Sequence, residues 1–121
     1  MVVEDGDSTS QAELERGLDL IEGGDYFEAH EVLEDVWRAA DRAERDFFQG
    51  LVHVAVAWYQ AGRGREVACR SQLAKAERRL TPYRPTHRGL DVADVLAQVR
   101  AAADAYPELV RPRFRRARRT G

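Results

Sequence analysis

The segment from Phe47 to Tyr59 constrains the fold more strongly than any other part of this chain. It reads Phe-Phe-Gln-Gly-Leu-Val-His-Val-Ala-Val-Ala-Trp-Tyr, so apolar side chains would lie on nearly every side of a helix. Such a helix is stable in water only when other elements cover it, because its apolar surface would otherwise be solvated. The sequence therefore predicts a central helix, from about Glu44 to Ala61, that is surrounded by other helices.

Four more helices are predicted around this central one, because apolar residues recur in each at intervals of three and four. The first opens at an apparent capping box, Ser10 to Glu13, and ends at Gly23-Gly24. No segment alternates polar and apolar residues as a half-buried strand would, and the links are short. The predicted fold class is all-α, a single-domain bundle of about five antiparallel helices built from hairpins. The other three helices are expected at about 25–40, 65–80 and 91–106. The expected core contains Leu33, Trp37, Leu51, Val54, Ala55, Trp58, Leu73 and Val95.

Three regions follow from the same patterns. Residues 1–9 are polar and acidic and show no helical period, so they are expected to form a disordered lead-in. Residues 10–106 are expected to form the helical bundle. Residues 107–121 are expected to form an arginine-rich C-terminal tail. Removing residues 111–121 is expected to leave folding intact, because no helical period runs through them.

Cysteine content and hydropathy indicate the cellular compartment in which the protein is expected. The single cysteine, Cys69, cannot form an intramolecular disulfide, and this fits a reducing environment. The sequence has no run of about 18 apolar residues and no basic-then-apolar N-terminus, so it predicts neither a membrane span nor a signal peptide. The expectation is a cytoplasmic protein.

Charge is distributed unevenly along the chain. Residues 1–60 hold 4 basic and 15 acidic side chains, whereas residues 61–121 hold 15 basic and 6 acidic ones. Opposite halves can attract each other within one domain or between two copies, so a homo-oligomer is one possible partner arrangement. The tail at 111–121 could bind nucleic acid, with arginines on phosphates and Phe114 stacked on a base. Alternatively, the tail docks on the acidic N-terminal half.

Polar side chains interrupt the apolar faces of the second and third predicted helices. His30 shares a row with Trp37 on the second helix, and Glu34 follows His30 by one helical turn. On the central helix, Gln49 and His53 form part of a single polar stripe. The economical arrangement places the two polar lines against each other. We therefore expect a pocket that contains His30, Glu34, Trp37, Gln49 and His53.

Three interpretations of this pocket remain open. A His–Glu pair across a helix–helix contact can be structural and fix which helices pack together. In that case His30→Ala is expected to lower stability by about 2–4 kcal/mol, because Glu34 would be left buried and unpaired. Alternatively, His30, Glu34 and His53 could bind a divalent metal such as zinc, iron, nickel or manganese, leaving an open coordination position. A third interpretation is direct acid–base catalysis.

Several segments in order resemble one protein family. The chain reads Gly-Asp-Tyr-Phe-Glu-Ala-His-Glu-Val-Leu-Glu-Asp-Val-Trp over 24–37, then Phe-Gln-Gly-Leu over 48–51 and Ala-Trp-Tyr over 57–59. These segments, with Gly-Leu-Asp-Val at 89–92, resemble domain of unknown function 309 over roughly residues 12–106. The family's pattern is His, three residues, Glu, two residues, then Trp or Tyr, and His30, Glu34 and Trp37 match it in full.

The resemblance implies an all-helical bundle and a suggested role of the His/Glu motif in metal binding, but no substrate. The chain departs from the family at Gln60, where many members carry His. If that residue is a metal ligand in other members, metal binding in this chain would have to depend on His53.

Two functional hypotheses follow. The leading one is a protein that binds a divalent metal or small ligand in the His/Glu pocket, with hydrolysis as one form of activity; whether it is an enzyme stays undecided. The alternative is an interaction module for protein or nucleic acid, in which the His/Glu pair is purely structural. A weak echo at an offset of 40 residues, such as Leu33 with Leu73, suggests tetratricopeptide-like helix hairpins.

Overall fold

The structure is a computed structural model that describes residues 6–117, and this part of the chain forms five α-helices. The predicted all-α fold is confirmed. A short 3-10 helix and a two-stranded hairpin lie between the fourth and fifth helices. The elements are α1 (Gly6–Glu22), α2 (Tyr26–Ala39), α3 (Arg42–Gly62), α4 (Glu66–Leu80), η1 (Thr81–Tyr83), β1 (Thr86–His87), β2 (Leu90–Asp91) and α5 (Val92–Ala105).

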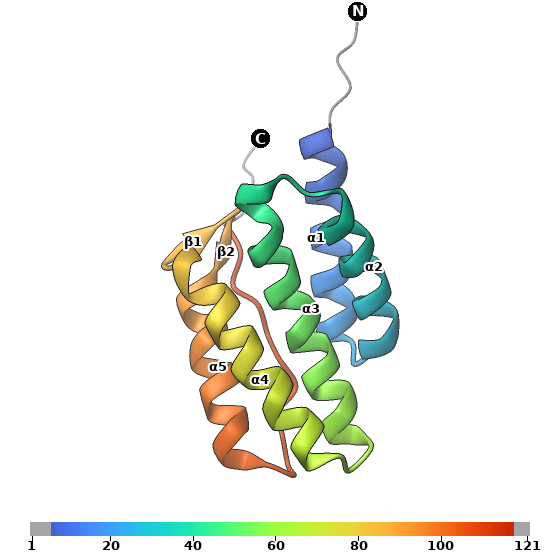
Figure 1. The fold of residues 1–121 in the computed structure, drawn as a ribbon, viewed down its shortest axis with the longest axis vertical. Coiled ribbons are helices and arrows are strands. Elements are labelled where there is room, and N and C mark those ends of the chain that lie inside the picture. The colour runs from blue at the N-terminus through green and yellow to red at the C-terminus, as the bar shows by residue number, and fades with distance from the viewer. Residues whose placement is uncertain (1–5, 118–121) are drawn as a thin grey trace, which may run out of the picture.

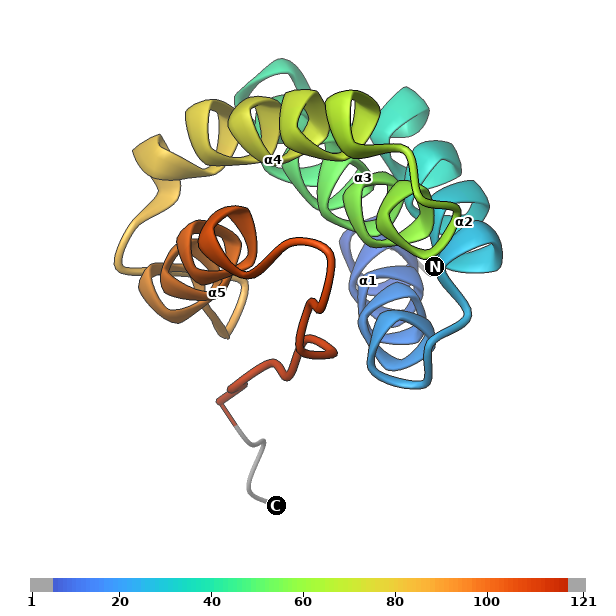
Figure 2. The same ribbon diagram turned by 90° about the horizontal axis from the view of Figure 1, so that it is seen from below.

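The helices form two layers. Consecutive helices pack against each other, α1 on α2, α2 on α3, α3 on α4 and α4 on α5. Helices α2, α3 and α4 make one layer, and α1 and α5 lie behind it (Figures 1 and 2). Seen from below, the chain after α5 runs through the space between α5 and α1 (Figure 2). A segment without helical structure therefore occupies a position that a sixth helix could take.

Helix α3 is the centre of the hydrophobic core, as its sequence predicts. Nine of its residues are buried, including Phe47, Leu51 and Trp58. The expected core residues are buried with one exception, Trp37, which is only partly buried and packs against the edge of the core.

Two glycines allow close approach between neighbouring helices. A Cβ atom added at Gly17 of α1 would lie 2.6 Å from the Leu33 side chain of α2. A Cβ atom at Gly50 of α3 would lie 2.6 Å from the Leu80 side chain of α4. Since such distances fall well inside van der Waals contact, glycine at these two positions sets how closely each helix pair packs.

The predicted start of the first helix is wrong. Helix α1 begins at Gly6, so Ser10 and Glu13 lie inside it rather than capping it. Extending a helix that has already formed adds a hydrogen bond for each residue ordered, so the helix can begin before the predicted cap. The expectation for residues 1–5 lies outside the described residues. Asp91 caps α5, because its side chain accepts a hydrogen bond from the amide of Asp94 at 2.9 Å.

The hairpin was not predicted. His87 pairs with Leu90, which leaves the two-residue turn Arg88-Gly89, and both turn residues have positive φ, +50° and +80°. Two-residue turns with positive φ at both positions match the twist of the flanking strands. The usual sequence signal is Asn-Gly or Asp-Gly, and Arg-Gly does not give it.

Residues 107–117 lie between α1 and α5 and contact side chains of both helices, and we call the surface that they contact the groove between α1 and α5. Phe114 is buried in the main core, and the indole Nε1 of Trp58 donates a hydrogen bond to the Val110 carbonyl at 3.0 Å. The guanidinium of Arg116 contacts the carboxylates of Glu15, Asp19 and Glu22. Of the two interpretations of the tail, docking on the acidic half describes this segment. Because Phe114 is buried, it does not present its ring to a base.

No helix among residues 6–117 is both long and apolar enough to cross a membrane.

Candidate functional site

His30 and Glu34 form a loose, partly exposed pair on α2. The distance between His30 Nε2 and Glu34 Oε1 is 3.5 Å, and the two side chains are 27% and 31% exposed. Glu34 also lies 3.4 Å from a guanidinium nitrogen of Arg38. These distances exceed those of a strong charge-assisted hydrogen bond. The pair is therefore close to solvent and free to exchange partners.

Aromatic side chains flank the pair on the α2–α3 surface. The Phe27 ring is 52% exposed and lies 5.6 Å, centroid to centroid, from both the His30 ring and the Tyr59 ring of α3. Toward the other end of α2, the guanidinium of Arg45 lies 5.2 Å from the Trp37 ring centre. We call the surface formed by Phe27, His30, Glu34, Trp37 and Tyr59 the α2–α3 face.

His30 and Glu34 are partly buried, but they lie outside the fully buried side of α2. The buried side of α2 consists of Ala29, Val32, Leu33 and Val36. Successive helical residues differ by about 100°, so His30 lies at the flank of that side and Glu34 still further round. The predicted row through His30 and Trp37 is real, but it follows the edge of the packed surface rather than its centre.

His53 lies in a different contact from His30. Its Nδ1 is 2.7 Å from Gln72 Oε1 of α4, and because the amide oxygen can only accept, Nδ1 donates. Burial lowers the pKa of His53, and the nearby cations Arg79, Lys75 and Arg78 lower it further, against the hydrogen bond to Gln72. Its Nε2 is buried and has no hydrogen-bond partner. His53 therefore lies in the α3–α4 contact, where burial and the neighbouring cations disfavour its protonated form.

The predicted metal site is not assembled. In the described part of the chain, no group of three or more His, Cys, Asp or Glu side chains is arranged to hold a metal ion. His30 and Glu34 are together, whereas the described hydrogen bond of His53 goes to Gln72. Gln49 is partly exposed on α3. The ion-pair contacts of His30 and Glu34 lie within α2, whereas His53 belongs to the contact between α3 and α4.

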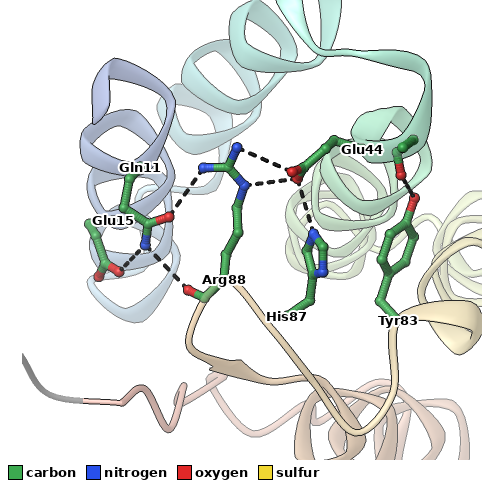
Figure 3. A network of polar contacts seen from close by, with 7 residues as sticks. Gln11, Glu15, Glu44, Tyr83, His87 and Arg88 are labelled. Atoms are coloured by element: carbon green, nitrogen blue, oxygen red, sulfur yellow. Dashed lines mark hydrogen bonds and ion pairs between the residues drawn. The ribbon is translucent and has the colours of Figure 1, made fainter. Parts of the chain in front are cut away.

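A second polar cluster, which the sequence did not reveal, joins the hairpin to α1 and α3 (Figure 3). Arg88 donates to both carboxylate oxygens of Glu44, from Nε at 2.8 Å and from Nη2 at 3.3 Å, and from Nη1 to Gln11 Oε1 at 3.2 Å. Gln11 returns a hydrogen bond to the Arg88 carbonyl at 3.3 Å. His87 donates to Glu44 at 3.0 Å, and the Tyr83 hydroxyl donates to the Ala43 carbonyl at 2.7 Å.

This cluster is built as a structural clamp. The Arg88 side chain is only 13% exposed and its guanidinium lies 5.3 Å from the Phe48 ring centre. Its positive φ is unusual for a residue other than glycine, and the surrounding contacts hold that conformation. The hydrogen bonds of Arg88 and Glu44 bind the hairpin to two helices. The two residues are 44 positions apart, so no local sequence pattern predicts that they pair.

Comparison with known families gives one match. Residues 14–71 match the model of the family described as domain of unknown function (DUF309). A comparison with curated proteins found no match. The resemblance inferred from the sequence is confirmed over this range, which is shorter than the 12–106 expected. The matched range includes His30, Glu34, Trp37, Gln49 and His53, and it excludes the hairpin, α5 and the C-terminal segment.

Proposed function

We propose that this chain is a binding module that recognises a partner protein through the α2–α3 face. The observation that carries the proposal is the exposed Phe27 ring, held between His30 and Tyr59 beside a loosely paired carboxylate. An aromatic ring fixed by its neighbours loses little conformational freedom on binding, and such rings are enriched where binding energy concentrates.

Charge indicates the chemistry of the partner. The α2 surface carries Glu28, Glu31, Glu34 and Asp35, with Arg38 as the basic side chain of its last turn. A partner segment with an apolar side chain for Phe27 and a lysine or arginine for Glu34 would complement this face. Partner cations would replace Arg38, which is more exposed than Glu34 and makes only a surface ion pair.

Metal binding receives less support from the same residues. His30 and Glu34 offer two donor atoms, whereas open catalytic zinc sites usually use three protein ligands. The described residues supply no third ligand of the His, Cys, Asp or Glu type. A rise in melting temperature with Zn²⁺, Ni²⁺, Mn²⁺ or Fe²⁺ that His30→Ala abolishes would favour the metal hypothesis over the proposed one.

Site-specific photo-crosslinking tests the proposal. A photoreactive benzoylphenylalanine placed at Phe27 in the full-length chain should crosslink a discrete protein in lysate from the source organism. The matched control carries the same group at Val67 of α4, an exposed apolar position that lies off the α2–α3 face. Adding Glu34→Arg to the Phe27 version should reduce the yield by about tenfold, because a charge reversal repels a basic partner. Equal labelling from both positions would contradict the proposal.

A further inference from the structure

The C-terminal segment is bound by the helices in the way that a groove binds an extended peptide. It leaves α5 at a turn, runs back between α5 and α1, and ends beside the hairpin (Figures 1 and 2). Over residues 111–116 its side chains alternate, with Arg111, Arg113 and Arg115 exposed and the intervening three residues turned inward. Alternation of this kind is typical of an extended peptide whose every second side chain is read by its receptor.

The groove also recognises the backbone of the segment. The Gln98 side chain of α5 pairs with both the amide and the carbonyl of Arg113, and the amide of Phe114 donates to Glu22 of α1 at 2.7 Å. Beyond it, the amide of Asp91 donates to the Arg115 carbonyl at 2.9 Å, adding the segment to the edge of the hairpin. Backbone contacts of this type do not depend on which chain supplies the peptide.

Two inward side chains supply the specificity. Phe114 is 8% exposed and belongs to the main hydrophobic core. Arg116 lies 3.5, 3.1 and 3.0 Å from carboxylate oxygens of Glu15, Asp19 and Glu22 on α1. One guanidinium among three carboxylates leaves an excess of negative charge, so the groove attracts basic segments at a distance and holds them at short range.

We propose that the groove between α1 and α5 is a peptide-binding site that residues 110–117 occupy as an intramolecular ligand. Its partner is an extended, arginine-containing segment of another protein, with an aromatic residue two positions before an arginine. The chain's own segment competes with that partner at the high effective concentration that a short tether gives. A partner can therefore bind only when residues 110–117 leave the groove. Their competition raises the partner concentration that is needed for binding.

A chain cut between the helices and the segment tests this proposal. A specific protease site is inserted at Pro107-Glu108, which is exposed in the turn after α5, and the full-length protein is cut after folding. The probe is a fluorescent peptide of residues 109–117, Leu-Val-Arg-Pro-Arg-Phe-Arg-Arg-Ala. We expect the cut fragment to remain bound at low salt and to exchange with the probe, whereas the uncut chain binds the probe about tenfold or more weakly.

Two matched peptides and one protein variant define specificity. A probe in which alanine replaces the residue equivalent to Phe114 or Arg116 should bind about tenfold more weakly, whereas alanine at the exposed Arg113 equivalent should change little. Glu22→Gln in the cut protein should weaken binding and reduce its salt dependence.

Circular dichroism of the cut protein measures whether the helices need the segment in order to fold. If the helical signal falls on cutting and returns when the probe is added, the probe is again a ligand in trans, and the proposal is supported. If the fragment dissociates and the probe does not bind at high concentration, whether or not the helices stay folded, the proposal is overturned.

Discussion

Glu44, near the start of α3, accepts two hydrogen bonds from the guanidinium of Arg88, which lies in the hairpin turn before α5. The pair joins the hairpin to the central helix, and Gln11 extends the connection to α1. Most other ion pairs of the described residues lie at the surface, where water weakens them. This one is sheltered and bidentate, so it should contribute measurably to stability.

Replacing Arg88 should therefore destabilise the fold. Arg88→Asn keeps a residue that tolerates positive φ but removes the guanidinium, which leaves the Glu44 carboxylate partly buried with fewer donors. We expect the free energy of unfolding to fall by about 1–3 kcal/mol in urea denaturation. Arg100→Gln is the control, since its ion pair with Glu77 is exposed and should matter by less than about 1 kcal/mol. Equal losses in the two variants would show that the clamp contributes no more than a surface pair.

The same cluster predicts a dependence on pH. Burial opposes ionisation of Glu44, but the hydrogen bonds from Arg88 and His87 outweigh it and hold the pKa of Glu44 below its ordinary value of 4.5. A carboxyl whose pKa is lowered by folding stabilises the protein above its unfolded-state pKa, and this contribution is lost as the pH falls through the lower, folded-state value. The difference in unfolding free energy between wild type and Glu44→Gln should therefore shrink as the pH falls below about 4.5. A difference that does not change down to pH 3 would contradict this assignment.

His30 should matter little for stability. The sequence alone suggested that, in a structural role, His30→Ala would cost about 2–4 kcal/mol by leaving a buried carboxylate unpaired. Since both side chains are partly exposed and 3.5 Å apart, we now expect a loss below about 1 kcal/mol by thermal or urea unfolding. Leu33→Ala, on the fully buried side of the same helix, should cost about 2–5 kcal/mol. If both variants lost a similar amount of unfolding free energy, His30 would contribute to stability as a core residue does.

The close approach of α1 and α2 gives a test with an internal control. Gly17→Ala should lower stability by about 1–3 kcal/mol, because its methyl group would overlap Leu33 at 2.6 Å. At Gly62, the last residue of α3, an added Cβ meets nothing within 4 Å, so Gly62→Ala should be neutral or stabilise by up to about 1 kcal/mol. Combining Gly17→Ala with Leu33→Ala should cost less than the sum of the two changes, which a double-mutant cycle measures.

Loss of the C-terminal segment should weaken the fold, contrary to the expectation from sequence that removing residues 111–121 leaves folding intact. Phe114→Ala should cost about 3–5 kcal/mol, as for other buried phenylalanines. Phe27→Ala, which removes a half-exposed ring, should cost about 1 kcal/mol or less. Thermal unfolding of both variants distinguishes the core role of Phe114 from the surface position of Phe27. An unchanged melting temperature for Phe114→Ala would support the expectation that residues 111–121 are not needed for folding.

The helices were predictable because their signals are local. Leu14, Leu18 and Ile21 mark one face of α1 within two turns, and the apolar run on α3 identifies the covered helix without knowledge of its neighbours. Glycine pairs and Asp91 mark helix ends through the local backbone chemistry that they favour. These features depend on residues a few positions apart.

The site was less predictable because it depends on which side of α2 faces its neighbours. A row through His30 and Trp37 and a row through Ala29 and Val36 differ by about 100°, and both contain apolar residues. Only packing against α1 and α3 decides between them. The Arg88–Glu44 pair and the burial of Phe114 rest on contacts between residues far apart in sequence, for which a periodic pattern gives no signal.

The position of the C-terminal segment has a consequence for how the protein is made. The Arg116 guanidinium meets Asp19 across 97 residues of chain, and Phe114 meets Glu22 across 92. During synthesis the N-terminal helices emerge first and can pack in order, but the groove between α1 and α5 stays open until residues 110–117 have left the ribosome. The contacts that fill this groove are therefore among the last long-range contacts to form, and until then the facing surfaces of α1 and α5 are accessible to chaperones and to other basic segments.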